Sequence, residues 1–226
     1  KTIEKISQTH IKGGDCILLE GGKTFEGMVW INNYKDSSSS SSPITISSFG
    51  TGISTIFANG RPAIFIDNIG NVNIENINVV SNGSQNNTLN GIVVISDSQN
   101  IENIKINNVR VFGFGGFGLN IEVNNTGKFI KNISVTNSSF YQNGRAGLIA
   151  HGREITSIQK IILDNLFVFD NLGLPGKNYN TGDGIVLANT YDGKISNSRI
   201  FNNGIYCSAS NCASGIMTYS SSKILI

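Results

Sequence analysis

The strongest constraint on the fold is an internal repeat with a period of roughly 30 residues, a length typical of solenoid proteins. An asparagine at the end of a short apolar run recurs at intervals of 32, 29, 28 and 32 residues, at Asn76, Asn108, Asn137, Asn165 and Asn197. A second kind of apolar run begins with glycine and recurs at intervals of 27, 29, 37 and 31 residues, at Gly91, Gly118, Gly147, Gly184 and Gly215. A period of this length that contains three short strands predicts a parallel β-helix, whose stacked coils share one apolar core.

The composition agrees with a chain of short strands and tight corners. Ile and Val dominate the apolar residues, and the chain has 26 Gly but only 3 Pro. Asparagine tolerates the left-handed conformation at a corner, and its amide can bond the equivalent amide one coil away. A second corner column holds Asn82, Asn143, Asn171 and Asn203 and is interrupted by Phe114. We therefore predict an all-β, right-handed parallel β-helix with coils of about 28–32 residues and asparagine ladders at its corners.

The chain is predicted to form a single β-helix domain over residues 1–226. Residues 1–12 (KTIEKISQTHIK) have helical spacing and predict a short capping helix. Residues 13–62 supply the first coils, with a Ser-rich insertion at 37–42, and residues 63–226 supply the regular coils. The last segment, SSSKILI, stops inside a coil, so we expect further C-terminal coils beyond a truncated end.

The charge pattern excludes two classes of partner. Only 14% of the residues are charged and the formal net charge is +2, so no basic block indicates nucleic acid. No stretch approaches the roughly 20 consecutive apolar residues that insert into a membrane.

Cysteines and glycosylation signals indicate a secreted or cell-surface protein. Cys207 and Cys212 lie in a short polar loop (CSASNC) and predict a local disulfide, which requires an oxidising compartment. Cys16 lies in an apolar strand and is expected to be a buried free thiol. Asn86 and Asn124, in loops, are the candidate glycosylation sites.

Two long segments carry a resemblance to a known group of proteins. KTIEKISQTHIKGGDCILLEGGKTFEG followed by SPITISSFGTG is similar to the opening of secreted proteins of the pectin-lyase-like superfamily. The GDGIVLA and SGIMTYSSSKILI segments resemble the right-handed β-helix repeat of the same group. The resemblance covers essentially the whole chain and implies the fold and a carbohydrate ligand. It leaves the reaction open, because the superfamily includes lyases, hydrolases, epimerases, tailspikes and adhesins.

The activity patterns of that superfamily are altered or absent here. NTGDGI, from Asn180 to Ile185, is similar to the NTDGI segment of polygalacturonases but is interrupted by Gly182. The paired Asp, Gly-His-Gly and Arg-x-Lys segments that follow in polygalacturonases are not found. The Asp cluster with a basic residue of calcium-dependent pectate lyases is also not found.

Alternation along the Gly-led strands places one pair of candidate catalytic residues side by side. The two outward columns hold Val93, Asn120, Ile149, Val186 and Met217, and Ile95, Glu122, His151, Ala188 and Tyr219. Glu122 and His151 are expected on adjacent strands about 5 Å apart, where the carboxylate would raise the pKa of the imidazole. Such a pair could perform general acid–base chemistry on a sugar, and the alternative is a surface ion pair.

A second pair of candidates flanks the longest insertion, LGLPGKNYNTGD. Asp170 and Asp183 could serve as acid and base in glycoside hydrolysis or as Ca²⁺ ligands, and the alternative is that both are turn residues. No other cofactor is indicated.

Basic and aromatic residues near these candidates could bind an anionic sugar, with an ordinary solvated surface as the alternative. They are Arg145, Arg153, Lys177, Tyr179 and Tyr219.

The function expected from these patterns is that of a secreted polysaccharide-active protein, either a glycoside hydrolase or a polysaccharide lyase. The alternative is a noncatalytic structural, adhesive or glycan-binding surface protein. Self-association through the apolar column of Val93, Ile149, Val186 and Met217 is a third possibility. An enzyme should gather Glu122, His151, Asp183 and basic residues into one cleft.

Overall fold

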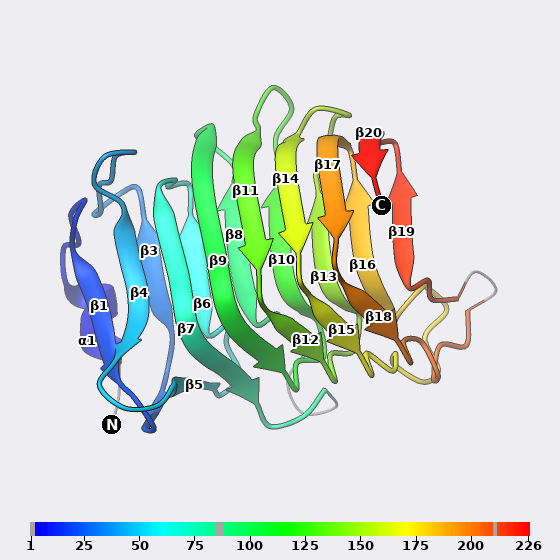
Figure 1. The fold of residues 1–226 in the computed structure, drawn as a ribbon, viewed down its shortest axis with the longest axis horizontal. Helices are drawn as coiled ribbons and strands as arrows, with labels where there is room; N and C mark the ends of the chain where they lie inside the picture. Colours follow the sequence, from blue (N-terminus) through cyan, green and yellow to red (C-terminus); the bar gives the residue numbers. More distant parts are fainter. Residues whose placement is uncertain (1–2, 85–87, 210–211) are drawn as a thin grey trace.

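The computed structural model describes residues 3–84, 88–209 and 212–226 and shows a parallel β-solenoid (Figure 1). A seven-stranded sheet, here called the short sheet, contains one strand from each turn. Its strands are β3 (Val29–Asn32), β6 (Ile64–Asp67), β8 (Ile92–Ser96), β10 (Phe117–Val123), β13 (Ala146–His151), β16 (Asp183–Ala188) and β19 (Ile216–Tyr219). The all-β solenoid prediction is therefore confirmed.

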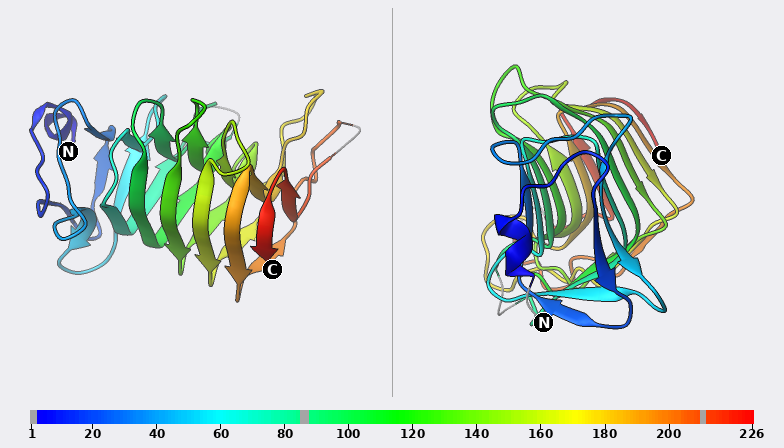
Figure 2. Two further views of the ribbon diagram at one scale, coloured as in Figure 1. Left: turned by 90° about the horizontal axis from the view of Figure 1, so that it is seen from above. Right: turned by 90° about the vertical axis from the view of Figure 1, so that its left-hand side faces the viewer.

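The remaining strands form a bent sheet of 13 strands, here called the long sheet. Its main path is β1 (Cys16–Glu20), β4 (Ile44–Phe49), β7 (Val72–Ser81), β9 (Ile101–Phe112), β11 (Ile130–Thr136), β14 (Ile158–Asp164), β17 (Thr190–Ser196) and β20 (Ser222–Leu225). Its side branch is β2 (Thr24–Glu26), β5 (Ser54–Ala58), β12 (Ser139–Tyr141), β15 (Phe167–Phe169) and β18 (Arg199–Phe201). The strands of successive turns lie side by side along the axis (Figure 2).

The N-terminal helix lies where it was predicted but is shorter. Within the range 1–12, helix α1 covers only Glu4–Gln8, and residues 1–2 are outside the described part of the chain. It packs near β3 at the N-terminal end of the solenoid (Figure 2). The Ser-rich insertion at 37–42 is closed by backbone bonds between Ser39 and Ser42.

The core is built from columns of apolar side chains, one from each turn. On the short sheet, the inward positions predicted from alternation are fully buried from Ile92 and Val94 through to Ile185 and Leu187. The last strand differs, because Ile216 is half-buried and Thr218 is exposed. Neighbouring turns supply the other half of each contact, so each turn depends on the next for its burial.

The exposed corner between the two halves of the long sheet carries the predicted asparagine ladder. Asn76, Asn108, Asn137, Asn165 and Asn197 all have φ between 51° and 55°. The amide of Asn108 donates to Asn76 Oδ1 at 2.8 Å, and that of Asn165 donates to Asn137 Oδ1 at 2.8 Å. The column is not continuous, since Asn137 and Asn197 donate instead to Asn107 and Asp164.

The second predicted ladder is buried. Asn143 donates its side-chain amide to Asn171 Oδ1 at 3.1 Å, and Asn171 donates to Asn203 Oδ1 at 2.9 Å. Gly118, Gly147 and Gly184, at the starts of three short-sheet strands, lie against this ladder. A Cβ on Gly118 would lie 2.6 Å from the Gly147 carbonyl oxygen and 2.7 Å from Asn143 Nδ2, so a side chain has no space there.

The prediction that Cys16 is buried is wrong, because its side chain is exposed. Ile17 and Leu19 occupy the inward positions of β1, so alternation places Cys16 and Leu18 on the outer face.

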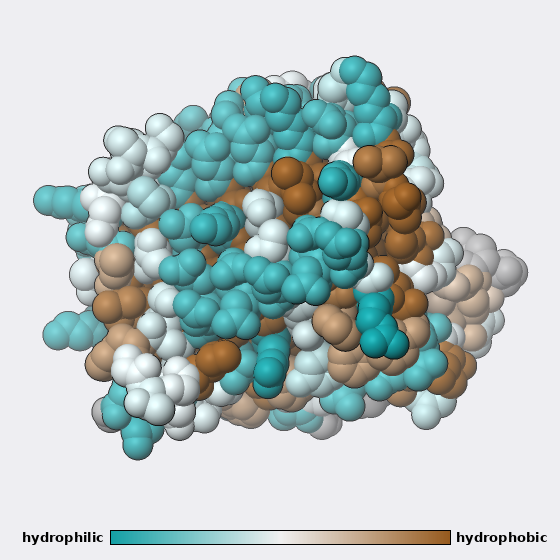
Figure 3. Space-filling model, viewed as in Figure 1, coloured by the Kyte–Doolittle hydropathy of each residue, from teal (hydrophilic) through white to brown (hydrophobic). Residues whose placement is uncertain are grey.

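The outer face of the long sheet is largely hydrophilic, and apolar surface gathers toward its C-terminal strands (Figure 3). Ile162 of β14 and Leu225 of β20 are 48% and 61% exposed. Among the described residues, no helix combines the length and the apolar character required to cross a membrane.

We expect Asn171→Ala to lower the free energy of unfolding by roughly 2–4 kcal/mol, because it leaves several buried polar groups without partners. The amide also donates to the Phe140 carbonyl at 3.1 Å, and Oδ1 accepts the Asn143 backbone N–H at 3.0 Å. Urea unfolding followed by circular dichroism measures the change. Asn165→Gly, which keeps a positive φ at an exposed corner, should cost less than about 1 kcal/mol. Equal losses from both variants would contradict this account of the buried ladder.

Candidate active site

A cleft of about 390 Å³ opens on the outer face of the short sheet, where β10, β13 and β19 meet the loops at one edge. It is lined by Thr88, Leu89, Asn90, Gly116, Phe117, Asn120, Glu122, Arg145, Ile149, His151 and Tyr219. A separate hollow of about 420 Å³ lies beside α1, between Glu4 and Arg61, and holds none of the predicted site residues. The cleft brings together four of the predicted site residues: Glu122, His151, Arg145 and Tyr219.

Strand register places the acid–base pair as the alternation predicted. Glu122 of β10 pairs with His151 of β13 on adjacent strands, and Glu122 Oε1 lies 3.9 Å from His151 Nε2. Tyr219 stands beside Ala188 on the next pair of strands, and it reaches the same cleft.

Asn120 joins the two residues of the pair. Its Nδ2 donates to Glu122 Oε2 at 2.9 Å, and its Oδ1 lies 3.1 Å from His151 Nε2. A carboxylate can only accept a hydrogen bond, so Glu122 fixes the orientation of the Asn120 amide. The Asn120 oxygen then faces the imidazole, which must carry its proton on Nε2. Neutral His151 is therefore left with Nδ1 as its basic nitrogen, and that atom has no hydrogen bond to the described residues.

Glu122 raises the pKa of His151 as predicted, but the net shift of that pKa is downward. Burial lowers the pKa of His151 below its ordinary value of about 6.5, and this outweighs Glu122, which raises it. The positive charges of Arg145 and Arg153 lower the pKa further. His151 is thus neutral at neutral pH, as a general base requires.

Arg145 enters the cleft from the residue before β13. Its Cζ lies 4.5 Å from the centre of the Phe117 ring and 5.6 Å from the centre of the Tyr179 ring, within the range of cation–π attraction. No carboxylate of the described residues forms an ion pair with it. Its guanidinium is therefore available to an anionic group in the cleft.

Two other basic candidates lie outside the cleft lining. Arg153 donates from Nε to the Asn124 backbone carbonyl at 3.0 Å, in the turn that follows β13. Lys177 is exposed in the 172–182 loop, where its carbonyl accepts a hydrogen bond from Ser208 at 3.1 Å.

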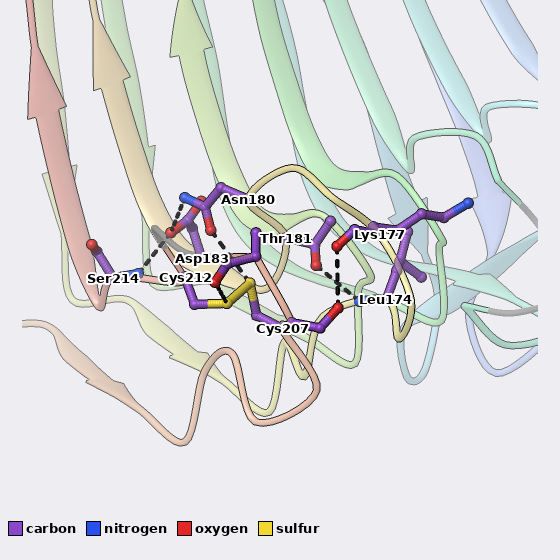
Figure 4. Close-up of a disulfide and its surroundings, with 10 residues drawn as sticks. Leu174, Lys177, Asn180, Thr181, Asp183, Cys207, Cys212 and Ser214 are labelled. Carbon is purple, nitrogen blue, oxygen red and sulfur yellow. Dashed lines mark hydrogen bonds between the residues drawn. A yellow bond between two sulfur atoms is a disulfide. The ribbon is translucent and has the colours of Figure 1, made fainter.

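The two aspartates of the second candidate pair also lie outside the lining. Asp170 has φ of +52° at a corner, in line with Gln142 and Asn202, so the turn alternative accounts for it. Asp183 is only 5% exposed and accepts hydrogen bonds from Asn180 Nδ2 at 2.9 Å and from the Ser214 backbone at 2.7 Å (Figure 4). Burial raises the pKa of the Asp183 carboxyl, against the hydrogen bonds from Ser214 and Asn180, which lower it. Asp183 therefore ties two loops together.

The predicted disulfide between Cys207 and Cys212 is present beside this tie (Figure 4). Of the glycosylation candidates, Asn124 is half-buried after β10, and Asn86 lies outside the described residues. In the described part of the chain, no three His, Cys, Asp or Glu side chains gather as a metal site, and Asp170 and Asp183 do not join in one.

The apolar outward column is covered within the chain itself. Val93, Ile149 and Val186 are 7%, 8% and 4% exposed, and Phe117 packs with the latter two. Met217 is half-buried and packs against the same cluster, so this column offers little exposed apolar surface to a second subunit.

Asn120 and Phe117 are among the cleft residues that sequence reasoning did not identify as site residues. Asn120 is the single polar side chain in an otherwise apolar outward column, and this interruption was the signal that could have identified it. Phe117 was hidden in the aromatic run VFGFGGFG, whose other buried member, Phe114, does pack in the core.

No protein-family model and no curated protein matches the chain. Among solved structures, the chain is similar to an alginate lyase from Paenibacillus sp. str. FPU-7, with a TM-score of 0.29 and 14% sequence identity. The alignment covers 94% of this chain and 91% of that chain. At this level of likeness, neither activity nor substrate follows from the neighbour.

We expect the imidazole of His151 to titrate below the ordinary histidine value, because the native fold binds this proton more weakly than the unfolded chain does. The chain has only 2 His, so the imidazole proton signals in an NMR titration are simple to assign with His10→Ala. Glu122→Gln should lower the His151 pKa further, since it removes the one charge that raises it. Because the pKa of His151 is lower in the native fold than in the unfolded chain, neutral His151 contributes to the free energy of unfolding. This contribution is complete above about pH 6.5 and is lost as the pH falls through the lowered pKa. A rise of the pKa in Glu122→Gln would contradict this electrostatic account.

Proposed function

We propose that this protein is a polysaccharide lyase of the extracellular space, with the cleft over β10, β13 and β19 as its active site. The observation that carries the proposal is a neutral imidazole beside an unpaired guanidinium in one cleft. This combination suits proton abstraction next to a carboxylate, the first step in eliminative cleavage of a uronate polysaccharide.

Five of the residues that line the cleft have a defined part in that reaction. Arg145 pairs with the uronate carboxylate and stabilises the negative charge that builds on it. His151 takes the adjacent carbon-bound proton on Nδ1, and the electrons of that bond form the new carbon–carbon double bond. The bond to the glycosidic oxygen breaks, and the departing oxygen receives a proton from the Tyr219 hydroxyl. Asn120 and Glu122 hold the imidazole in the tautomer that leaves Nδ1 free.

The carboxylate content of the cleft favours elimination over hydrolysis. Glycoside hydrolysis generally uses two carboxyl groups roughly 5–10 Å apart across the bond that is cleaved. Among the described residues that line the cleft, Glu122 is the single carboxylate, and it is bonded to Asn120.

An extracellular setting is supported by the Cys207–Cys212 disulfide, because such bonds persist in oxidising compartments. The polymeric substrate is in keeping with a cleft that lies on the outer face of a long solenoid, where a chain can extend past both ends of the site.

We expect His151→Ala to lower kcat by roughly 10²–10⁴-fold, the usual contribution of a positioned general base. Activity is measured on a panel of uronate polysaccharides by the ultraviolet absorbance of the unsaturated product and by reducing ends. Glu122→Gln should retain the fold and lose activity to a smaller extent, since it acts through the imidazole.

Two matched controls separate this effect from general damage. His10→Ala changes the exposed histidine near α1, and Glu75→Gln changes a carboxylate on β7 of the other sheet. Both should keep full activity. New reducing ends without ultraviolet absorbance would show that the protein is a hydrolase and not a lyase. Binding without cleavage of any polysaccharide would favour a noncatalytic glycan-binding protein.

A further inference from the structure

The guanidinium of Arg145 is contacted by rings from two other turns of the solenoid. Phe117 belongs to β10 in the turn before, and Tyr179 belongs to the loop that precedes β16 in the turn after. Arg145 itself is exposed, and a free arginine side chain loses rotamer entropy when it is fixed. Contacts that fix it before a ligand arrives reduce this cost at the moment of binding.

Phe117 and Tyr179 differ in how they are held. Phe117 is 8% exposed and packs on Ile149 and Val186, so its ring is part of the sheet surface. Tyr179 is 45% exposed and lies in the long loop of residues 172–182. Its position therefore depends on what holds that loop.

Three sets of hydrogen bonds hold the loop against the solenoid. The Arg145 carbonyl accepts the backbone N–H groups of Gly182 and Asp183 at 2.7 and 3.1 Å. The Asp183 carboxylate accepts the side-chain amide of Asn180, the residue next to Tyr179. Inside the loop, the Leu174 backbone donates to Thr181 Oγ1 at 3.0 Å (Figure 4).

The disulfide-closed loop of the next turn braces the same segment from outside. Ser214 donates its backbone N–H to Asp183, Ser208 donates to the Lys177 carbonyl, and Tyr206 donates its backbone N–H to the Leu172 carbonyl. Cys207 lies beside Asn180, with Sγ 3.9 Å from Oδ1 (Figure 4).

We infer that Tyr179 is a positioning residue, which holds the Arg145 guanidinium against Phe117 at the edge of the cleft. Asp183 and the Cys207–Cys212 loop hold Tyr179 in turn. The part that Arg145 plays toward a substrate rests on the proposed function, but the positioning itself does not. This gives Asp183 a structural part in the site although it does not line the cleft.

The test measures the pKa of His151, which depends on how close the Arg145 charge lies to the imidazole. The charged groups that act on this imidazole are Glu122, Arg145 and Arg153. If Tyr179→Ala releases Arg145 into solvent, the His151 pKa rises in an NMR titration of the full chain. Tyr179→Phe keeps the ring and should retain the wild-type pKa.

A double-mutant cycle shows whether Tyr179 acts through Arg145. Arg145→Gln should raise the His151 pKa, and adding Tyr179→Ala in that background should raise it no further. A wild-type pKa in Tyr179→Ala would overturn the inference. An equal rise with and without Arg145 would overturn it too, because Tyr179 would then act by shielding His151 from water.

The cycle is independent of activity, so it remains decisive even if no polysaccharide is cleaved. Tyr179→Leu serves as a second variant if Tyr179→Ala does not fold, as judged by circular dichroism. Where cleavage is observed, Tyr179→Ala should raise KM more than it lowers kcat, and Tyr179→Phe should restore KM.

Discussion

The constraint on which the rest of the structure depends is the in-register stacking of one turn on the next. Parallel strands hydrogen-bond at a spacing of about 4.8 Å, so each side chain lies over the residue one turn away. This single relation produces the apolar columns of the core, the exposed and buried asparagine ladders and the outward columns of the short sheet. A substitution in one turn therefore also alters the contacts that the residue makes with the turn before and the turn after. The buried ladder shows this most clearly, since Asn171 bonds both Asn143 and Asn203.

Features that follow from this stacking could be predicted from the sequence. The recurring Asn and Gly positions identify the turns, and alternation along the strands places Glu122 beside His151, as the register confirms. The Cys207–Cys212 disulfide was predicted on other grounds, because the two residues are five apart in one short loop. The expectation that Cys16 is a buried thiol was wrong, because Ile17 and Leu19 take the inward positions of β1. The helix expected over residues 1–12 was also longer than α1.

Features that depend on loops and burial could not be predicted. The sign of the His151 pKa shift is set by how far the surrounding cleft excludes water, and alternation carries no information about that. The contact between Tyr179 and Arg145 requires knowing how a long loop returns to the sheet. The role of Asp183 likewise became visible only through its bonds to Asn180 and Ser214. The sequence made Asp183 a candidate catalytic acid or Ca²⁺ ligand, and the structure adds that its hydrogen bonds link two loops.

The insertion between Gly147 and Gly184 has a wider consequence. The interval between these glycines is 37 residues, longer than the others, yet Leu148 still pairs with Ile185 and Ile149 with Val186. Extra residues are accommodated at the corner without moving the strands that carry the cleft floor. The strands and the loop at this corner are thus separable parts, because the register fixes the strands while the length of the loop varies independently. Loops of other lengths and compositions could be exchanged at this corner to change what contacts Arg145, while Asn120, Glu122 and His151 stay where the stacked turns place them.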